Sequence, residues 1–152
     1  MEGLDRILRE HPFFAGLSDA DLHFVAGCAR NHRFDAGDYL LREGQAANEF
    51  FLIRHGRVAL EIAAPGQAPS VLLTPGAGEM VGVSWLAPPY KWMYDARAME
   101  LVRAIGIDAA CLRNKCEADP RLGYEFSKRL MPVLVRRLHA TRLQHLDVYG
   151  VR

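Results

Sequence analysis

The stretch from Gly76 to Ala98 contains the residues of this chain that are best suited to bind a ligand. Gly82 closes a predicted strand-to-turn segment, and the residues Ser84-Trp85-Leu86 that follow are expected to form a short helix. Backbone N–H groups at such a glycine turn can surround an anion, particularly a phosphate. The sequence therefore predicts an anion-binding loop, although its glycine turn and short helix lack the acidic and basic side chains that such a site normally carries.

The same loop is rich in aromatic side chains and holds both tryptophans of the chain, Trp85 and Trp92. Two interpretations remain open. In the first, the Trp faces and Met93 line a pocket for an apolar or planar ligand. In the second, Trp92 fills the pocket from within and makes the loop rigid. Pro88-Pro89 stiffens the loop in either case.

Groups suited to catalysis or metal binding are scarce around this loop. Glu79 and Asp95 are its only acids, and neither has a recognisable partner for acid–base or nucleophilic chemistry. The six histidines of the chain show no spacing typical of metal ligands, such as HxxxH. We therefore predict a protein that is not an enzyme and holds no metal.

The strands that position the loop are predicted from hydrophobic periodicity. Short apolar segments separated by glycine and proline turns are typical of a β-sandwich or jelly roll. We expect strands at 39–42, 49–54, 57–62, 71–73 and 98–107. The second of these is apolar enough to be covered on both faces. His55-Gly56 is predicted to form a two-residue hairpin loop, and Glu61 to face water.

Helices are expected before and after these strands. A short helix covers residues 4–10, and Ser18 or Asp19 is placed to cap a second helix that runs to about Arg30. Asp108 is expected to cap a third helix, which ends near residue 117.

The last predicted helix begins at Pro120 and continues toward Tyr149. A narrow seam of residues at three-to-four spacing runs along it: Leu130, Leu134, Leu138, Thr141, His145 and Val148. Such a seam suits pairing with the same helix of a second copy about a two-fold axis. Packing back on the sandwich is the alternative, and both can hold over different turns.

Together these elements predict a single α+β domain that is mainly β. Half of its 152 residues are apolar and 24% are charged, which is ordinary for a soluble globular protein. Residues 1–32 form a helical N-terminus, 33–108 a jelly-roll β-sandwich (a double-stranded β-helix), and 109–150 the C-terminal helices.

The charge and the cysteine content limit the kinds of partner and the cellular compartment that we expect for this protein. The formal net charge of +1 argues against a polycation that binds nucleic acid. Arginines are concentrated in the last helix, where they form either a solvated face or a docking surface for an acidic partner. Three cysteines without metal-like spacing predict reduced thiols. With no apolar run long enough for a membrane span and no secretory leader, we expect a cytoplasmic protein that does not contact membranes.

The order of these features resembles the cyclic nucleotide-binding domain family, the sensor domain of bacterial catabolite-activator (Crp/Fnr-like) regulators. The resemblance rests on the strands and glycine turns of FDAGDYLLREGQAANEFFLIRHGRVALEI, on the Gly82 loop and on the Arg-rich final helix. It covers nearly the whole chain. It implies a jelly roll, a pocket for cAMP or cGMP, and a C-terminal helix that reaches over the pocket and dimerises. Thr141 matches a hydroxyl that contacts the base in nucleotide-binding members.

Two positions depart from the family's pattern. A Glu that binds the ribose follows the family's glycine, whereas Val83 follows Gly82 here. Counting back from Ala98 places Trp92 where an Arg binds the phosphate. Charge-assisted hydrogen bonds are worth about 1.5–3 kcal/mol each, so tight binding of cAMP or cGMP is disfavoured, although a cyclic nucleotide remains a candidate ligand. The degenerate pocket is predicted to comprise Gly82, Val83, Ser84, Trp85, Trp92, Met93 and Thr141.

The leading hypothesis is a non-enzymatic, homodimeric, ligand-sensing module of signal transduction, with weak or lost cyclic-nucleotide binding. The alternatives are a structural or protein-interaction subunit with a plugged pocket, or the sensor fragment of a Crp/Fnr-like transcriptional regulator. Little sequence follows the final helix, so we expect no helix-turn-helix and no direct nucleic-acid binding in this polypeptide. The output is then contact with an unknown protein partner.

Overall fold

Two antiparallel sheets of four strands form the centre of the computed structural model, which describes residues 2–148. One sheet has the strand order β1-β8-β3-β6 and the other β2-β7-β4-β5. The strands are β1 (Ala29–Phe34), β2 (Tyr39–Leu41), β3 (Glu49–His55), β4 (Val58–Ile62), β5 (Ser70–Leu73), β6 (Met80–Val81), β7 (Asp95–Ala98) and β8 (Val102–Asp108). This arrangement confirms the predicted jelly-roll β-sandwich.

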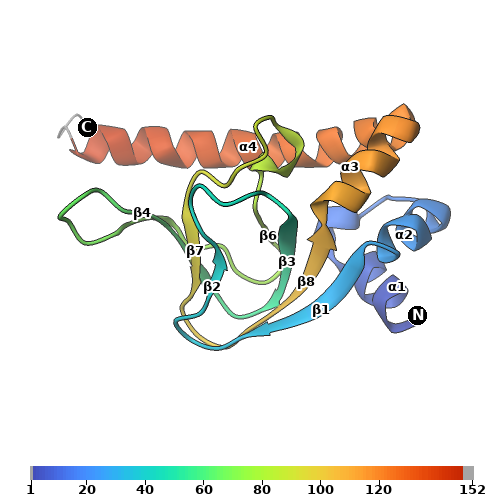
Figure 1. Ribbon diagram of the computed structural model, residues 1–152, viewed down its shortest axis with the longest axis horizontal. Helices are drawn as coiled ribbons and strands as arrows, with labels where there is room; N and C mark the ends of the chain where they lie inside the picture. The colour runs from blue at the N-terminus through green and yellow to red at the C-terminus, as the bar shows by residue number, and fades with distance from the viewer. Residues whose placement is uncertain (1, 149–152) are drawn as a thin grey trace.

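Helices precede and follow the strands in the chain, and one short helix, η2 (Ser84–Leu86), lies between β6 and β7. The helices are α1 (Glu2–Glu10), the 3₁₀ helices η1 (Pro12–Phe14) and η2, α2 (Asp19–Ala26), α3 (Ala109–Ala118) and α4 (Pro120–Val148). Figure 1 shows α4 running along one side of the sandwich, with α1 and α2 gathered at the end where α4 begins. The predicted end of α4 near Tyr149 lies outside the described residues.

Side-chain caps begin two of the helices, as the sequence predicts. The Ser18 hydroxyl accepts a hydrogen bond from the Asp21 backbone N–H at 3.2 Å, and the Asp108 carboxylate accepts one from the Cys111 N–H at 2.9 Å. Each cap satisfies an N–H group that has no partner within the helix. Within residues 2–148, no helix is both long and apolar enough to cross a membrane.

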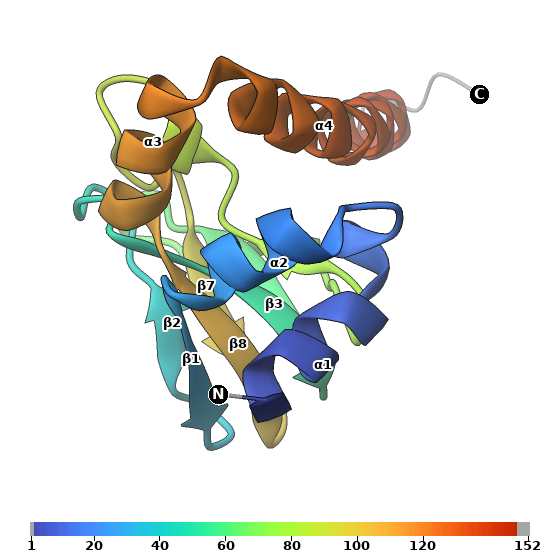
Figure 2. The same ribbon diagram turned by 90° about the vertical axis from the view of Figure 1, so that its right-hand side faces the viewer.

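The core lies between the two sheets and extends under α4. Phe50, Phe51, Leu52 and Ile53 of β3 are all buried, so β3 is covered on both faces as predicted. At the α4 side, the Trp85 ring stacks on Phe50 with centroids 4.6 Å apart. Figure 2, which looks onto the end of the sandwich where α4 begins, shows α2 between α1 and α4.

The second helix is shorter than the sequence predicts. It ends at Ala26, and Ala29–Phe34 forms strand β1, which pairs with β8 from Ala29↔Ile107 to Phe34↔Val102. The expectation of a helix to Arg30 is therefore wrong. The apolar spacing at 22, 25, 26 and 29 continues the helical pattern, but pairing with a core strand decides the conformation after Gly27.

Two predicted connections within the sandwich are also corrected. β3 and β4 lie in different sheets, so His55-Gly56 is a tight turn between sheets and not a hairpin loop. Gly56 has φ +90°, and a Cβ there would lie 2.3 Å from the Leu101 carbonyl oxygen. The single strand expected at 98–107 is not continuous: Ala98 is the last residue of β7 (Asp95–Ala98), and β8 begins at Val102, because the chain crosses from one sheet to the other between them.

Glu61 is buried, contrary to the prediction that it faces water. Its relative exposure is 5%, and its carboxylate accepts hydrogen bonds from the Arg97 guanidinium at 2.9 and 3.3 Å. β7 pairs with β4 and places Arg97 beside Glu61, which compensates for burying the charge. Alternation along one strand cannot predict this cross-strand partner.

The cysteines do not remain reduced as predicted. Cys28, in the turn after α2, forms a disulfide with Cys111 in the first turn of α3, with their Cα atoms 6.0 Å apart. The two residues are 83 positions apart in sequence, so chain spacing does not indicate the pairing. Cys116 is the free cysteine and is buried.

Candidate functional site

Gly82 is the first residue of the loop between β6 and β7, and only glycine suits its position. Its φ is +101°, a region that L residues with a side chain rarely adopt. A Cβ at this position would lie 2.8 Å from Cη2 of Trp92 and 3.1 Å from Cβ of Phe50. The Trp92 indole therefore covers the glycine turn directly.

Trp92 is held in this position by both its backbone and its ring. Its N–H donates to the Gln45 carbonyl at 2.9 Å, and its carbonyl accepts from the Gly44 N–H at 2.8 Å. Its side chain belongs to the hydrophobic core, and the residue is 5% exposed. The indole thus occupies space inside the domain beside the turn where the sequence predicts a ligand.

Tyr94 meets the backbone donors of the same turn. Its hydroxyl lies close to the N–H groups of Gly82 and Val83, and the Arg137 Nη1 of α4 donates to it at 3.4 Å. Burial raises the pKa of Tyr94, while Arg137 and the two amides act in the opposite direction. A neutral hydroxyl of the chain itself therefore faces the donors that could otherwise bind an anion.

Sequence reasoning missed both Tyr94 and Arg137 as members of this site. Tyr94 is two residues beyond Trp92, so a two-residue shift of the loop alignment would have selected it. Arg137 is one of several arginines in the last helix, and chain spacing does not show that it is the one that reaches the loop. In the structure it also donates to the Met80 carbonyl, which ties α4 to β6.

Trp85 is buried beneath the loop and does not line the surface above Gly82. It is fully buried, stacks on Phe50 and meets the Phe126 ring of α4 edge-on, with centroids 5.9 Å apart. Its carbonyl accepts from Arg113 of α3, whose guanidinium also lies over the Tyr90 ring, 4.4 Å from its centroid. Trp85 therefore links the loop to the C-terminal helices.

The remaining predicted site residues are more peripheral. Met93 is 66% exposed, and Ser84 is partly buried at the start of η2. Thr141 is exposed, and its hydroxyl donates to the Arg137 carbonyl of its own helix at 2.9 Å. The structure thus brings together Gly82, Val83 and Trp92, to which Tyr94 and Arg137 are added, whereas Met93 and Thr141 stand apart.

The two acids near the loop have structural partners. Glu79 accepts a hydrogen bond from the Gly76 N–H at 2.8 Å. Asp95 accepts one from the Glu43 N–H at 2.8 Å and pairs with Arg42. Among residues 2–148, no three or more His, Cys, Asp or Glu side chains are grouped so that they could hold a metal ion. The site is therefore built from backbone donors, aromatic rings and one arginine.

Known proteins share this architecture. One similar solved structure is that of a putative cyclic nucleotide-binding protein from Geobacter metallireducens, with a TM-score of 0.81 and 30% sequence identity. The match covers 89% of this chain and 98% of that protein's chain. The catabolite activator protein of Thermus thermophilus has a TM-score of 0.69 and 21% identity, over 91% of this chain and 63% of its own.

A curated relative is the CRP-like cAMP-activated global transcriptional regulator of Mycobacterium tuberculosis, 26% identical over 145 residues. The match spans 95% of this chain and 63% of the length of that regulator. The family model described as cyclic nucleotide-binding domain matches residues 31–119, more than half of the chain. The glycine turn, the jelly roll and these matches agree, and the chain belongs to the cyclic nucleotide-binding domain family.

Proposed function

We propose that this chain is a non-enzymatic regulatory module of the cyclic nucleotide-binding type. Side chains of the protein itself fill the ligand site at its Gly82 turn. The observation that carries the proposal is the position of Tyr94. Its hydroxyl faces the Gly82 and Val83 amides and the Arg137 guanidinium, while Trp92 covers Gly82. A cyclic nucleotide would have to displace both side chains.

Energetics also favours weak or lost binding of cAMP and cGMP. Val83 offers no acceptor for a ribose hydroxyl. A phosphate at the turn would gain Arg137 only by breaking its contacts with Met80 and Tyr94. Charge-assisted hydrogen bonds contribute about 1.5–3 kcal/mol each, so every one that is missing lowers affinity by about one to two decades.

Calorimetry on two matched double variants tests where the phosphate partner belongs. Val83→Glu with Tyr94→Arg places an arginine before the loop amides, and we expect it to bind cAMP at least about tenfold more tightly than the wild type. Val83→Glu with Trp92→Arg tests the placement made by counting along the sequence, and we expect a smaller gain. Tight cAMP binding by the wild type would contradict the proposal itself.

The module is proposed to form a homodimer through α4. An outward apolar stripe on this helix comprises Met131, Leu134, Val135 and Leu138, which are 57, 40, 60 and 52% exposed. Apolar side chains contiguous on one helix face are typical of an interface with a second helix. The stripe is rotated from the predicted seam, because Leu130 is 5% exposed and packs in the core.

Light scattering at several protein concentrations tests the dimer. Leu138→Glu places a charge in the stripe and is expected to give a monomer, because two copies would bury unpaired carboxylates. Leu143→Glu is the matched control, since Leu143 is also an exposed leucine of α4 but lies on another face. A dimer that survives Leu138→Glu would exclude this interface.

A permanently plugged interaction subunit is the second candidate, and the burial of Trp92 favours it. The two candidates differ in their response to ligands. A sensor gains about 2.7 kcal/mol of stability at a ligand concentration of one hundred dissociation constants, whereas a plugged subunit gains none. A melting-temperature screen with cAMP, cGMP and planar apolar compounds distinguishes them.

A further inference from the structure

An open groove lies outside the space that Trp92 fills. It has a volume of about 700 Å³ and runs between η1, the loop that joins β5 to β6, and the inner face of α4. Gly82, Trp92 and Tyr94 do not line it. Arg137 lies between the two regions, because it lines the groove and also contacts Tyr94.

The wall that α4 contributes to this groove is strongly basic. Lys128, Arg129, Arg136 and Arg137 all line it, and Glu79 is the acidic residue among its lining. Glu79 accepts a hydrogen bond from the Gly76 N–H within its own loop. The potential in the groove is therefore positive, which attracts an anion.

Donors on this wall are left without partners. Arg136 makes no hydrogen bond or ion pair with any residue between 2 and 148. Arg129 uses both of its Nη groups, but its Nε is buried and has no partner. A buried N–H without a partner is uncommon in folded proteins, so Arg129 keeps an unused donor beside the groove.

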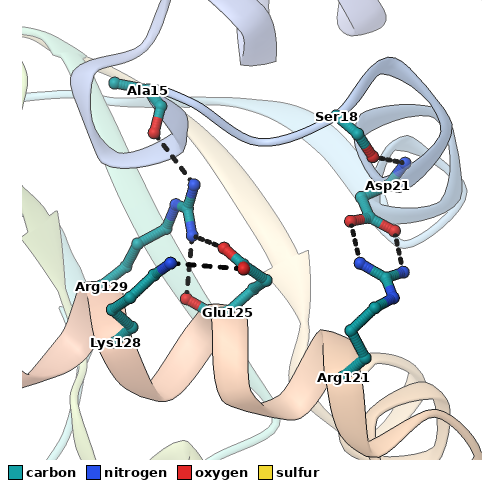
Figure 3. A network of polar contacts seen from close by, with 7 residues as sticks. All are labelled: Ala15, Ser18, Asp21, Arg121, Glu125, Lys128 and Arg129. Carbon is teal, nitrogen blue, oxygen red and sulfur yellow. Dashed lines mark hydrogen bonds and ion pairs between the residues drawn. The ribbon is translucent and has the colours of Figure 1, made fainter.

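The network in Figure 3 fixes the basic wall relative to η1 and α2. Arg129 donates to the Ala15 carbonyl at 2.9 Å and to Glu125 at 2.6 Å. Lys128 shares the same Glu125 carboxylate at 3.3 Å, so a single acid serves two cations. Arg121 and Asp21 form a two-point ion pair, at 2.7 and 2.9 Å, between α4 and α2. The groove is therefore formed before any ligand arrives, which lowers the cost of binding.

Other parts of the groove lining are apolar. Pro12 and Phe13 of η1 and Pro75 of the β5–β6 loop face it, together with Val133 of α4. Ligand sites commonly combine such apolar walls with a few polar groups that fix orientation. We propose that this groove binds a small organic anion with an apolar body, whose carboxylate or phosphate is held by Arg136 and Arg129. The proposal is independent of cyclic-nucleotide binding at the Gly82 turn.

Titration of the isotope-labelled protein, followed by backbone NMR, tests the proposal. The probes are octanoate and octyl phosphate. Two half probes serve as controls: 1-octanol has the apolar body without the anionic group, and inorganic phosphate has the anionic group without the apolar body. We expect saturable binding of at least one of the two amphipathic anions below its micelle concentration, with shifts in η1, the β5–β6 loop and α4. The half probes are expected to bind more weakly. Binding of octanoate alone identifies a carboxylate site, and of octyl phosphate alone a phosphate site.

Two matched variants locate the anion. Arg136→Glu is expected to weaken binding at least about tenfold, because it removes a charge-assisted hydrogen bond and adds repulsion. Arg142→Glu is the control, since Arg142 is an exposed arginine of α4 that does not line the groove. Equal weakening by both variants, equal binding of 1-octanol, shifts confined to residues 82–94, or no saturable binding would each overturn the proposal.

Discussion

Replacement of Trp92 by alanine measures how firmly the loop is filled from within. The indole is 5% exposed, lies against Gly82 and belongs to the hydrophobic core, so its removal leaves a cavity inside the domain. Truncation of a buried tryptophan costs about 3–5 kcal/mol of unfolding free energy. For a chain of this length, that corresponds to a decrease in melting temperature of roughly 6–20 °C.

Urea denaturation and thermal melting at fixed protein concentration provide the assay. Trp85 remains as the fluorescent reporter in the variant, and it is itself fully buried. Met93→Ala is the matched control, because Met93 is the adjacent residue but is 66% exposed, and we expect a change within about 0.5 kcal/mol.

Indole added to the Trp92→Ala protein tests the cavity directly. A small ring that re-enters the space should restore about 2.7 kcal/mol at one hundred times its dissociation constant. A loss below about 1 kcal/mol in the Trp92→Ala protein would refute the view that this ring packs in the core. Failure of indole to stabilise a strongly destabilised variant would show instead that the loop collapses over the gap.

Three further predictions follow from titrating groups. Burial lowers the pKa of His11, whose Nε2 donates to the Ile53 carbonyl. The free energy of unfolding should therefore fall as the pH drops below about 6.5. Replacement of His11 by Gln should flatten this pH dependence in urea titrations. The hydrogen bonds from Arg121 hold the pKa of Asp21 below its usual value, so Asp21→Asn should destabilise the protein at pH 7 but not at a pH below that pKa. Burial raises the pKa of Cys116 to about 11, so alkylation by iodoacetamide at pH 8 should be slow in the folded protein and fast in urea.

Local signals in the sequence were sufficient for most of the elements. Ser18 and Asp108 cap the predicted helices because a short polar side chain satisfies free N–H groups wherever a helix begins. The apolar run at β3 correctly predicts a strand buried on both faces. These features depend on neighbouring residues in the chain, so a single sequence contains the necessary information.

Features decided by distant residues could not be predicted in the same way. Whether a strand continues past Ala98 or a new one begins at Val102 depends on which sheet each segment joins, and hydrophobic alternation does not distinguish the two cases. The burial of Glu61 depends on Arg97, which lies 36 residues away. Cys28 and Cys111 approach because a turn after α2 lies beside the start of α3, which their sequence separation of 83 does not indicate.

The candidate site shows the same division. Gly82 was identified from its own loop, because the conformation of a tight turn is a local property. Tyr94 could not be assigned to the site from the sequence, because its role depends on the position of its hydroxyl in the folded chain. Arg137 could not be assigned either, because it belongs to α4, 55 residues after Gly82. The aromatic content of the loop indicated a changed pocket without indicating which ring meets the amides.

The chemistry of a hydroxyl differs from that of a phosphate in one respect that matters for regulation. A bound phosphate can dissociate, so its contacts with a helix exist only while ligand is present. The Tyr94 hydroxyl is covalently attached to the loop, so its contact with Arg137 is intramolecular. The effective concentration of the hydroxyl at Arg137 is therefore fixed by the chain and does not depend on the concentration of a metabolite. Under the proposed function, regulation of the relation between the loop and α4 requires either a ligand that displaces Tyr94 or a ligand in the basic groove that shares Arg137.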